Sequence, residues 1–226
     1  MKRLATILAT LLVTGTAATA HAEEDGQFWI APIVQTPVVG KLRAWIELQA
    51  RAKDEGKQLD RLIVRPALNY PLGHGFSAWV GYGYLPFTRG AESKLYPEHR
   101  SWQQLTHLGG DPALGQVQNR LRFEERFIDN VDTAALRLRH MVRLVYRPKS
   151  WSGFGFALWD EIFVNLNSPS ANIRAGFDQN RFALGVQYAV TKKLILEPSY
   201  VAISQWRAHR ETLVAHTGLL FVWITL

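Results

Sequence analysis

Long segments with strict two-residue alternation constrain this chain more than any other feature of its sequence. In the clearest, residues 135–147, Arg137, Arg139 and Arg143 share one parity, while the other parity carries apolar side chains such as Leu138. Because successive side chains of a β-strand point to opposite faces, this pattern predicts a strand with one basic and one apolar face. Such segments exceed the ~5–6 residues common in soluble sheets and match the ~9–11 residues of a strand that crosses a bilayer.

Two further segments show the same division. Residues 41–51 place charged side chains and Trp45 on one parity, and residues 119–128 alternate charged with mostly apolar residues. In all, eleven segments have this period. Their approximate bounds are 28–37, 41–53, 59–71, 75–86, 101–108, 117–128, 134–147, 154–166, 179–190, 194–205 and 212–226.

The connections between these segments alternate in length. Short ones include 39–40, 73–75 and 192–193, and longer polar ones include 54–60 and 88–100. Short periplasmic turns alternating with longer outer loops are typical of outer-membrane barrels. The pattern therefore predicts an all-β fold, a single closed antiparallel transmembrane barrel. A soluble β-sandwich with one wet face is the alternative, which the length of the strands disfavours.

The first 22 residues have the pattern of a secretory signal. A positive start at Lys2 and Arg3 is followed by a short apolar stretch and by an Ala-X-Ala pattern that ends at Ala22. The apolar run is too short for the ~20 residues of a membrane-spanning helix. We therefore predict a cleaved signal peptide over 1–22 and a barrel domain over 23–226, located in a bacterial outer membrane.

Composition excludes several classes of site and partner. The chain has no cysteine, which excludes disulfides and cysteine-ligated metals, and it has no zinc-protease or esterase motif. We expect neither a metal nor a cofactor. Lysine and arginine number 26 against 19 acidic residues, but an exported protein does not meet nucleic acid. The expected partners are outer-membrane lipids and lipopolysaccharide, periplasmic chaperones and the barrel-insertion machinery during biogenesis, and a small anionic solute.

The number of strands depends on where the two ends of the chain lie. Eleven strands would put the ends on opposite sides, whereas bacterial barrels normally have an even number with periplasmic ends. Segment 28–37 carries Pro32 and Pro37 and no charged face, and proline inside a strand indicates an edge or non-strand role. We therefore expect about ten strands, with segment 28–37 outside the barrel wall, and twelve as the alternative.

Several motifs occur in an order that is familiar from one protein family. They include LIVRPALNY at 62–70, EHRSWQQL at 98–105, NRLRFEERF at 119–127, DEIFVN at 160–165 and GFDQNR at 176–181. This series, which runs over nearly the whole mature chain, resembles the uncharacterised outer-membrane family known as domain of unknown function 2490 (DUF2490). The resemblance implies an outer-membrane barrel and no particular activity.

Projecting the alternation onto a barrel directs the charged faces into the lumen. This predicted lumen charge network consists of Arg43, Glu47, Arg51, Arg65, Arg120, Arg122, Glu124, Arg126, Arg137, Arg139, Arg143, Glu161, Arg181 and Glu197. Since isolated buried charge is very costly, one interpretation is a ladder of arginine–carboxylate pairs that fills the lumen and fixes strand register. Because arginine exceeds glutamate, the other interpretation is a narrow passage or pocket for small anionic solutes.

A third hypothesis concerns the outer rim, where a long loop is expected. His99 and the adjacent Glu98 are weak candidates for the catalytic residues of a lipid or lipopolysaccharide hydrolase. The sequence favours a protein that is not an enzyme. Glu98, Arg100, Trp102 and Gln104 are expected to form a rim cluster. That cluster would be either a binding lip or a salt-bridged loop anchor, with Trp102 in an aromatic girdle.

Overall fold

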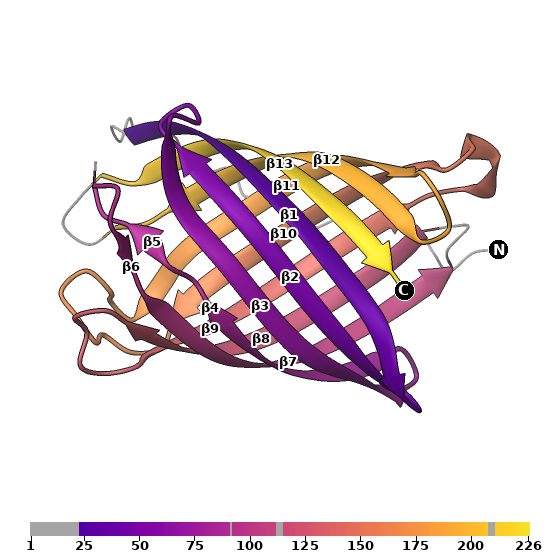
Figure 1. The fold of residues 1–226 in the computed structure, drawn as a ribbon, viewed down its shortest axis with the longest axis horizontal. Helices are drawn as coiled ribbons and strands as arrows, with labels where there is room; N and C mark the ends of the chain where they lie inside the picture. The colour runs from indigo at the N-terminus through magenta and orange to yellow at the C-terminus, as the bar shows by residue number, and fades with distance from the viewer. Residues whose placement is uncertain (1–22, 91, 112–114, 208–210) are drawn as a thin grey trace, which may run out of the picture.

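The computed structural model describes residues 23–90, 92–111, 115–207 and 211–226, so the predicted signal peptide lies outside the described residues. Within these ranges eleven long strands form a closed barrel (Figure 1). They are β1 (Glu23–Val39), β2 (Leu42–Lys53), β3 (Gln58–Gly73), β4 (Phe76–Tyr84), β7 (Glu98–Asp111), β8 (Gly115–Ile128), β9 (Ala135–Tyr146), β10 (Phe154–Asn165), β11 (Gly176–Ala189), β12 (Leu194–Gln205) and β13 (Leu213–Thr225). Two short strands, β5 (Phe87–Thr88) and β6 (Leu95–Tyr96), extend one loop, and η1 (Lys149–Trp151) is a 3₁₀ turn. In the described part of the chain, no helix has the length and apolar character needed to cross a membrane.

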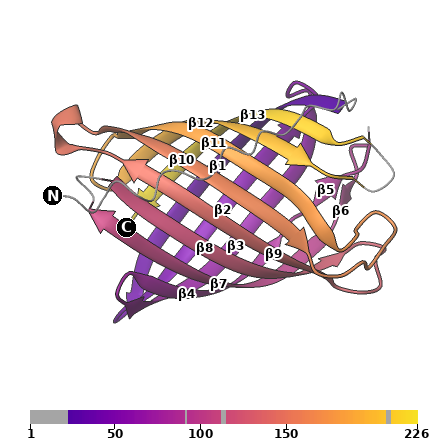
Figure 2. The same ribbon diagram turned by 180° about the vertical axis from the view of Figure 1, so that it is seen from behind.

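The barrel is closed by a parallel pair of strands. Successive barrel strands pair antiparallel, with β4 joined to β7, and β1 pairs parallel with β13 from Glu23↔Leu213 to Gln35↔Thr225. The strands run obliquely around the wall in both views (Figures 1 and 2). The prediction of an all-β barrel of about ten to twelve strands is thus confirmed.

The expectation that segment 28–37 lies outside the wall is wrong. These residues belong to β1, and the side chains of Trp29 and Ile33 are buried inside the barrel. The pairing of β1 with β2 has a gap between Ile30 and Ile33, which contains Pro32, and a register shift that begins at Pro37. Each proline therefore lies where the ladder with β2 is already interrupted, so its missing N–H removes little from that pairing.

The two ends of the barrel differ in the length of their connections. The long-loop end carries β5, β6 and the connections 129–134 and 166–175, whereas the short-turn end carries the turns 40–41 and 74–75. In Figure 1 the long-loop end lies at the left, beside the labels of β5 and β6.

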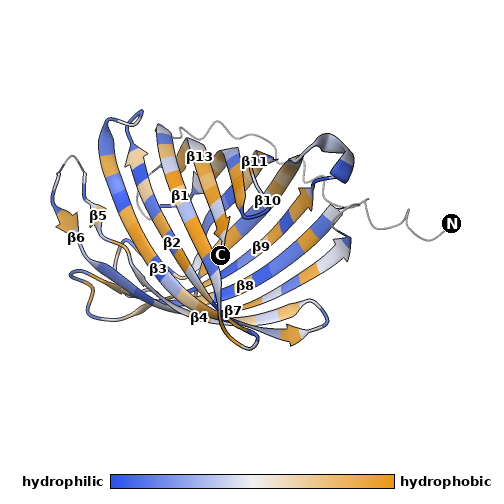
Figure 3. Ribbon diagram, turned by 45° about the vertical axis from the view of Figure 1, so that its right-hand side comes forward, coloured by the Kyte–Doolittle hydropathy of each residue, from blue (hydrophilic) through white to orange (hydrophobic). Residues whose placement is uncertain are grey.

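The outer face of the barrel is apolar across many strands. Hydrophobic and hydrophilic residues alternate along the strands in Figure 3, as the two-residue period predicts. Exposed large apolar side chains include Ile46, Leu68, Val80, Leu105, Leu121, Leu144, Leu158 and Leu184. The same alternation sends the intervening charged side chains inward.

Candidate functional site

A cavity of about 760 Å³ lies inside the barrel. Its wall includes Asp25 and Lys53 near the long-loop end and Gln35, Arg43 and Ser77 near the short-turn end. The cavity therefore extends along most of the length of the barrel.

The fourteen residues of the predicted lumen charge network lie on the inner side of the wall. Twelve line the cavity, and Glu124 and Glu197 are fully buried beside it, where they contact arginines. Arg61, on β3, belongs to the same inner face but was not included in the predicted network, although it lies within the predicted strand segment 59–71. Its parity, shared with Arg65, was the signal that could have identified it.

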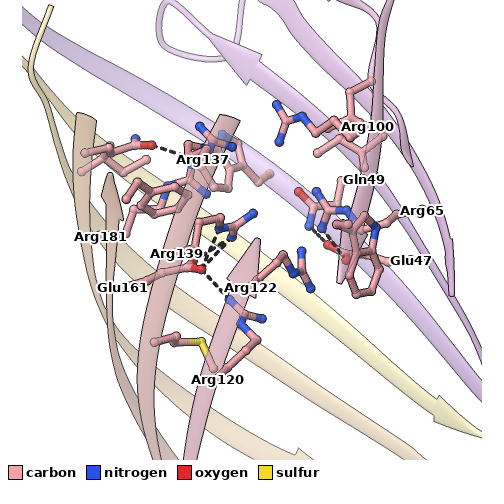
Figure 4. Close-up of a pocket in the computed structure, with 18 of the residues that line it drawn as sticks. Glu47, Gln49, Arg65, Arg100, Arg120, Arg122, Arg137, Arg139, Glu161 and Arg181 are labelled. Atoms are coloured by element: carbon pink, nitrogen blue, oxygen red, sulfur yellow. Dashed lines mark hydrogen bonds and ion pairs between the residues drawn. The ribbon is translucent and has the colours of Figure 1, made fainter. Parts of the chain in front are cut away.

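Glu124 is at the centre of the largest group of ion pairs. Its carboxylate lies 2.6 Å from Arg137 Nη2 and 2.6 Å from Arg139 Nη1. Arg139 also lies 2.8 Å from Glu161, which accepts a hydrogen bond of 2.7 Å from Arg120 (Figure 4). The chain of alternating charge thus joins β8, β9 and β10, and it satisfies carboxylates that would be very costly to bury alone.

Glu98 forms a second group nearer the long-loop end. It accepts hydrogen bonds from Arg100 Nε at 2.6 Å and Arg126 Nε at 2.8 Å, and Arg61 Nη1 lies 3.1 Å away. Arg100 also lies 3.5 Å from Glu124, which links the two groups. Together they tie β3, β7, β8 and β9 on the inner side of the wall.

The expected rim cluster is wrong, because its members lie within the barrel wall. β7 begins at Glu98, so Glu98, Arg100, Trp102 and Gln104 all point inward and are buried. The indole of Trp102 packs against the backbone of Gly81, which has no side chain to obstruct it. Trp102 therefore belongs to the lumen wall and not to an outer aromatic girdle.

Glu98 and His99 are separated by the barrel wall. Adjacent residues of a strand point to opposite faces, so His99 points outward and its Nδ1 shares a hydrogen bond with the hydroxyl of Tyr82. On the same outer face, Ser101 donates a hydrogen bond to Glu125. The acid–base pair considered for a hydrolase is therefore not assembled.

Several lumen arginines are held by amides and aromatic rings. Arg51 donates a 2.7 Å hydrogen bond to Gln49 Oε1, and its guanidinium lies 3.7 Å from the ring centroid of Trp29. Arg122 Nε donates a 2.8 Å hydrogen bond to Gln104 Oε1. These contacts orient the two arginines without neutralising them.

The lumen has surplus positive charge and N–H groups that lack partners. The cavity wall and its ion-pair partners contain thirteen arginines and Lys53 against nine carboxylates. Within the described residues, Arg122 Nη1, Arg120 Nε and Arg181 Nε are buried and make no hydrogen bond, although Arg122 Nη1 lies 3.8 Å from Glu124. The surplus of guanidinium groups on the cavity wall makes the site chemically suited to an anion that accepts hydrogen bonds.

Comparison of this sequence with known protein families identifies the family to which the chain belongs. The chain matches, over residues 26–214, the family described as protein of unknown function (DUF2490). It belongs to the DUF2490 family. An uncharacterised protein of Methylorubrum extorquens is 32% identical over 192 residues, which are 84% of this chain and 83% of the relative. The resemblance drawn from the motifs is confirmed.

Among solved structures, an anion-selective porin from Comamonas acidovorans is similar to this DUF2490 chain with a TM-score of 0.40 and 10% sequence identity. The match covers 82% of this chain and 53% of the porin chain, so this chain spans about half the length of that protein.

Aromatic residues line the DUF2490 lumen toward the short-turn end. The ring centroids of Trp45 and Trp79 are 5.4 Å apart, those of Trp45 and Trp223 are 5.9 Å apart, and those of Phe221 and Trp223 are 5.2 Å apart. These four residues, named here the aromatic cluster, come from β2, β4 and β13. Alternation places Trp45 on the inner face, but only closure of the barrel brings the four rings together.

The segment between β4 and β7 contributes to the cavity wall at the long-loop end. Lys53 Nζ donates a 3.1 Å hydrogen bond to the carbonyl of Gly90, and the side chain of Leu85 is buried at the cavity wall. In the same loop, the hydrogen bond from Tyr96 to Glu92 raises the pKa of the Tyr96 hydroxyl. Among the residues that the structure describes, no group of three or more histidine or acidic side chains could hold a metal ion.

Proposed function

We propose that this DUF2490 protein is a barrel of the bacterial outer membrane whose lumen binds and passes small anionic solutes. Two features support the membrane location. The outer face is apolar. The barrel is closed, so that the strands satisfy each other's backbone hydrogen bonds, as a β-protein in lipid requires. The short-turn end would face the periplasm and the long-loop end the outside. The partners of the protein would be outer-membrane lipids, lipopolysaccharide, periplasmic chaperones and the barrel-insertion machinery.

The observation that carries the solute part of the proposal is the long cavity with its surplus of arginine. Ion pairs around Glu98 and Glu124 occupy one side of the wall, as expected of a structural ladder. They leave space beside Arg51, Arg122 and Arg181, where the described residues supply amides and aromatic rings. The structural ladder and the anion site are therefore two parts of one lumen.

Ion selectivity in planar lipid bilayers tests this function. The purified mature protein, folded as judged by heat-modifiable migration, should give a reversal potential that favours anions across a salt gradient. Arg122→Gln and Arg181→Gln should each reduce this preference, because each removes a lumen charge whose hydrogen bonds go to a glutamine side chain and not to a carboxylate. Arg89→Gln is the matched control, since Arg89 pairs with Asp129 in the loops outside the cavity.

Two outcomes would count against the function. A folded barrel that gives no current would refute the proposal that the lumen passes solutes. A current that favours cations would refute the proposed preference for anions. Equal selectivity of the Arg122→Gln and Arg89→Gln proteins would show that the lumen arginines do not set it.

A further inference from the structure

One row of paired residues joins the arginines of the lumen to its aromatic cluster. Trp79 on β4 pairs with Gln104 on β7, and Gln104 pairs with Arg122 on β8. All three side chains line the cavity. Because neighbouring strands lie about 4.8 Å apart, the backbones that carry the indole and the guanidinium are separated by about 10 Å. A cationic group and an aromatic surface thus lie within the span of one small organic molecule.

The cationic side of this row is prepared for a carboxylate. Gln104 Oε1 accepts a hydrogen bond from Arg122 Nε, and the guanidinium carbon of Arg122 lies 4.1 Å from the ring centroid of Trp102. The Arg122 side chain therefore has little conformational freedom. In Figure 4 the head of Arg122 projects into the space between the Arg139–Glu161 pair and the Arg65–Glu47 pair. Planar guanidinium groups bind carboxylates through two parallel hydrogen bonds, and Arg122 lines the cavity with its Nη1 3.8 Å from Glu124, beyond hydrogen-bond distance.

The aromatic side presents ring surface to the cavity. Trp79 Nε1 donates to Thr106 Oγ1 at 3.1 Å, and Trp223 Nε1 donates to Glu197 Oε2 at 3.1 Å. With these polar tips bonded, the half-buried rings offer the lumen mainly apolar surface. Covering such surface is favourable by about 25 cal/mol per Å², whereas an inorganic anion would gain nothing from it.

We propose that the lumen ligand is an amphiphilic anion, a carboxylate attached to an aromatic body. Its carboxylate binds Arg122 and its ring packs on the aromatic cluster of Trp45, Trp79, Phe221 and Trp223. This inference rests on the proposed function and narrows its solute from small anions in general to aromatic carboxylic acids.

Calorimetric titration of the purified mature protein in detergent, corrected with empty micelles, tests the inference. The probes are 4-phenylbutyrate, butyrate, which lacks the ring, and 4-phenylbutanol, which lacks the charge. We expect 4-phenylbutyrate to bind at least about tenfold more tightly than either, because it alone engages both sides of the row.

Variants separate the two sides of the site. Trp45→Leu should weaken 4-phenylbutyrate about tenfold and leave butyrate unchanged, whereas Arg122→Gln should weaken both acids. Trp151→Leu is the control, because Trp151 lies in the turn before β10 and not on the cavity wall. Phe221→Leu replaces Trp45→Leu if that variant does not give a heat-modifiable barrel.

The outcomes distinguish this inference from the function on which it rests. Equal affinity for butyrate and 4-phenylbutyrate, or no binding by a barrel that still conducts anions selectively, overturns the amphiphilic ligand and leaves the anion function standing. No binding together with no anion selectivity overturns both.

Discussion

Replacing Glu124 by glutamine should destabilise the barrel, because this carboxylate neutralises several arginines at once. Glu124 has no exposed surface and lies 2.6 Å from both Arg137 and Arg139 and 3.5 Å from Arg100. Removing one partner of a buried ion pair costs about 3–5 kcal/mol. Each of these arginines keeps a second carboxylate, and glutamine keeps one acceptor oxygen, so we expect the lower end, about 3 kcal/mol.

Urea unfolding of the protein in lipid vesicles, followed by tryptophan fluorescence, measures this difference. With a slope of about 1–3 kcal/mol per molar urea, a loss of 3 kcal/mol lowers the midpoint by about 1–3 M. Glu92→Gln is the control, since Glu92 is an exposed loop carboxylate and its loss should change stability by about 0.5 kcal/mol or less. Identical midpoints for the two variants would refute the reasoning that Glu124 compensates buried arginine charge.

Three further changes test other parts of the structure. Leu184→Arg, at an exposed position on β11, should destabilise the barrel in vesicles by about 2–4 kcal/mol, because it places a charge on the apolar outer face, which faces lipid if the proposed membrane location is right. Gly81→Val should destabilise it by about 1–3 kcal/mol, because a side chain there overlaps the indole of Trp102. Glu98→Gln should lower the urea midpoint while His99→Ala leaves it nearly unchanged, because Glu98 pairs with arginines inside the wall and His99 faces outward.

Each of these changes has a result that contradicts it. A fully stable arginine at position 184 would argue that the outer face does not contact lipid. An unchanged midpoint for a side chain at position 81 would mean that the Trp102 packing is not tight. Equal losses at positions 98 and 99 would contradict their placement on opposite faces.

Alternation identified the faces of the strands but could not identify the partners of the charged residues. Glu124 and Arg137 were both directed inward by parity, yet their contact depends on the register that pairs them across β8 and β9. Arg120 and Glu161 bond across β9, from strands that are not adjacent. Such contacts depend on the curvature of the closed wall, which no local sequence pattern records.

The start of β7 shows a second limit of reading polar residues as loops. Glu98, His99 and Arg100 were assigned to a loop because they are consecutive polar residues, but the structure has them in a strand. In a barrel whose inner face is charged, polar residues at alternate positions are compatible with a strand. Consecutive polar residues, which indicate a loop in a soluble sheet protein, are therefore a weaker indication of a loop in this barrel.

β1 belongs to the barrel wall although its residues 28–37 have no charged face. Residues 28–37 carry no charge, yet Trp29 on this strand lies 3.7 Å from the guanidinium carbon of Arg51 and 5.1 Å from that of Arg181. An aromatic ring stabilises arginines from other strands without supplying a carboxylate. Since parallel pairing of β1 with β13 also closes an odd number of strands, neither the prolines nor the even-number rule excludes this segment. The uncharged inner face of residues 28–37 therefore packs against arginines of other strands and adds no carboxylate that would neutralise them.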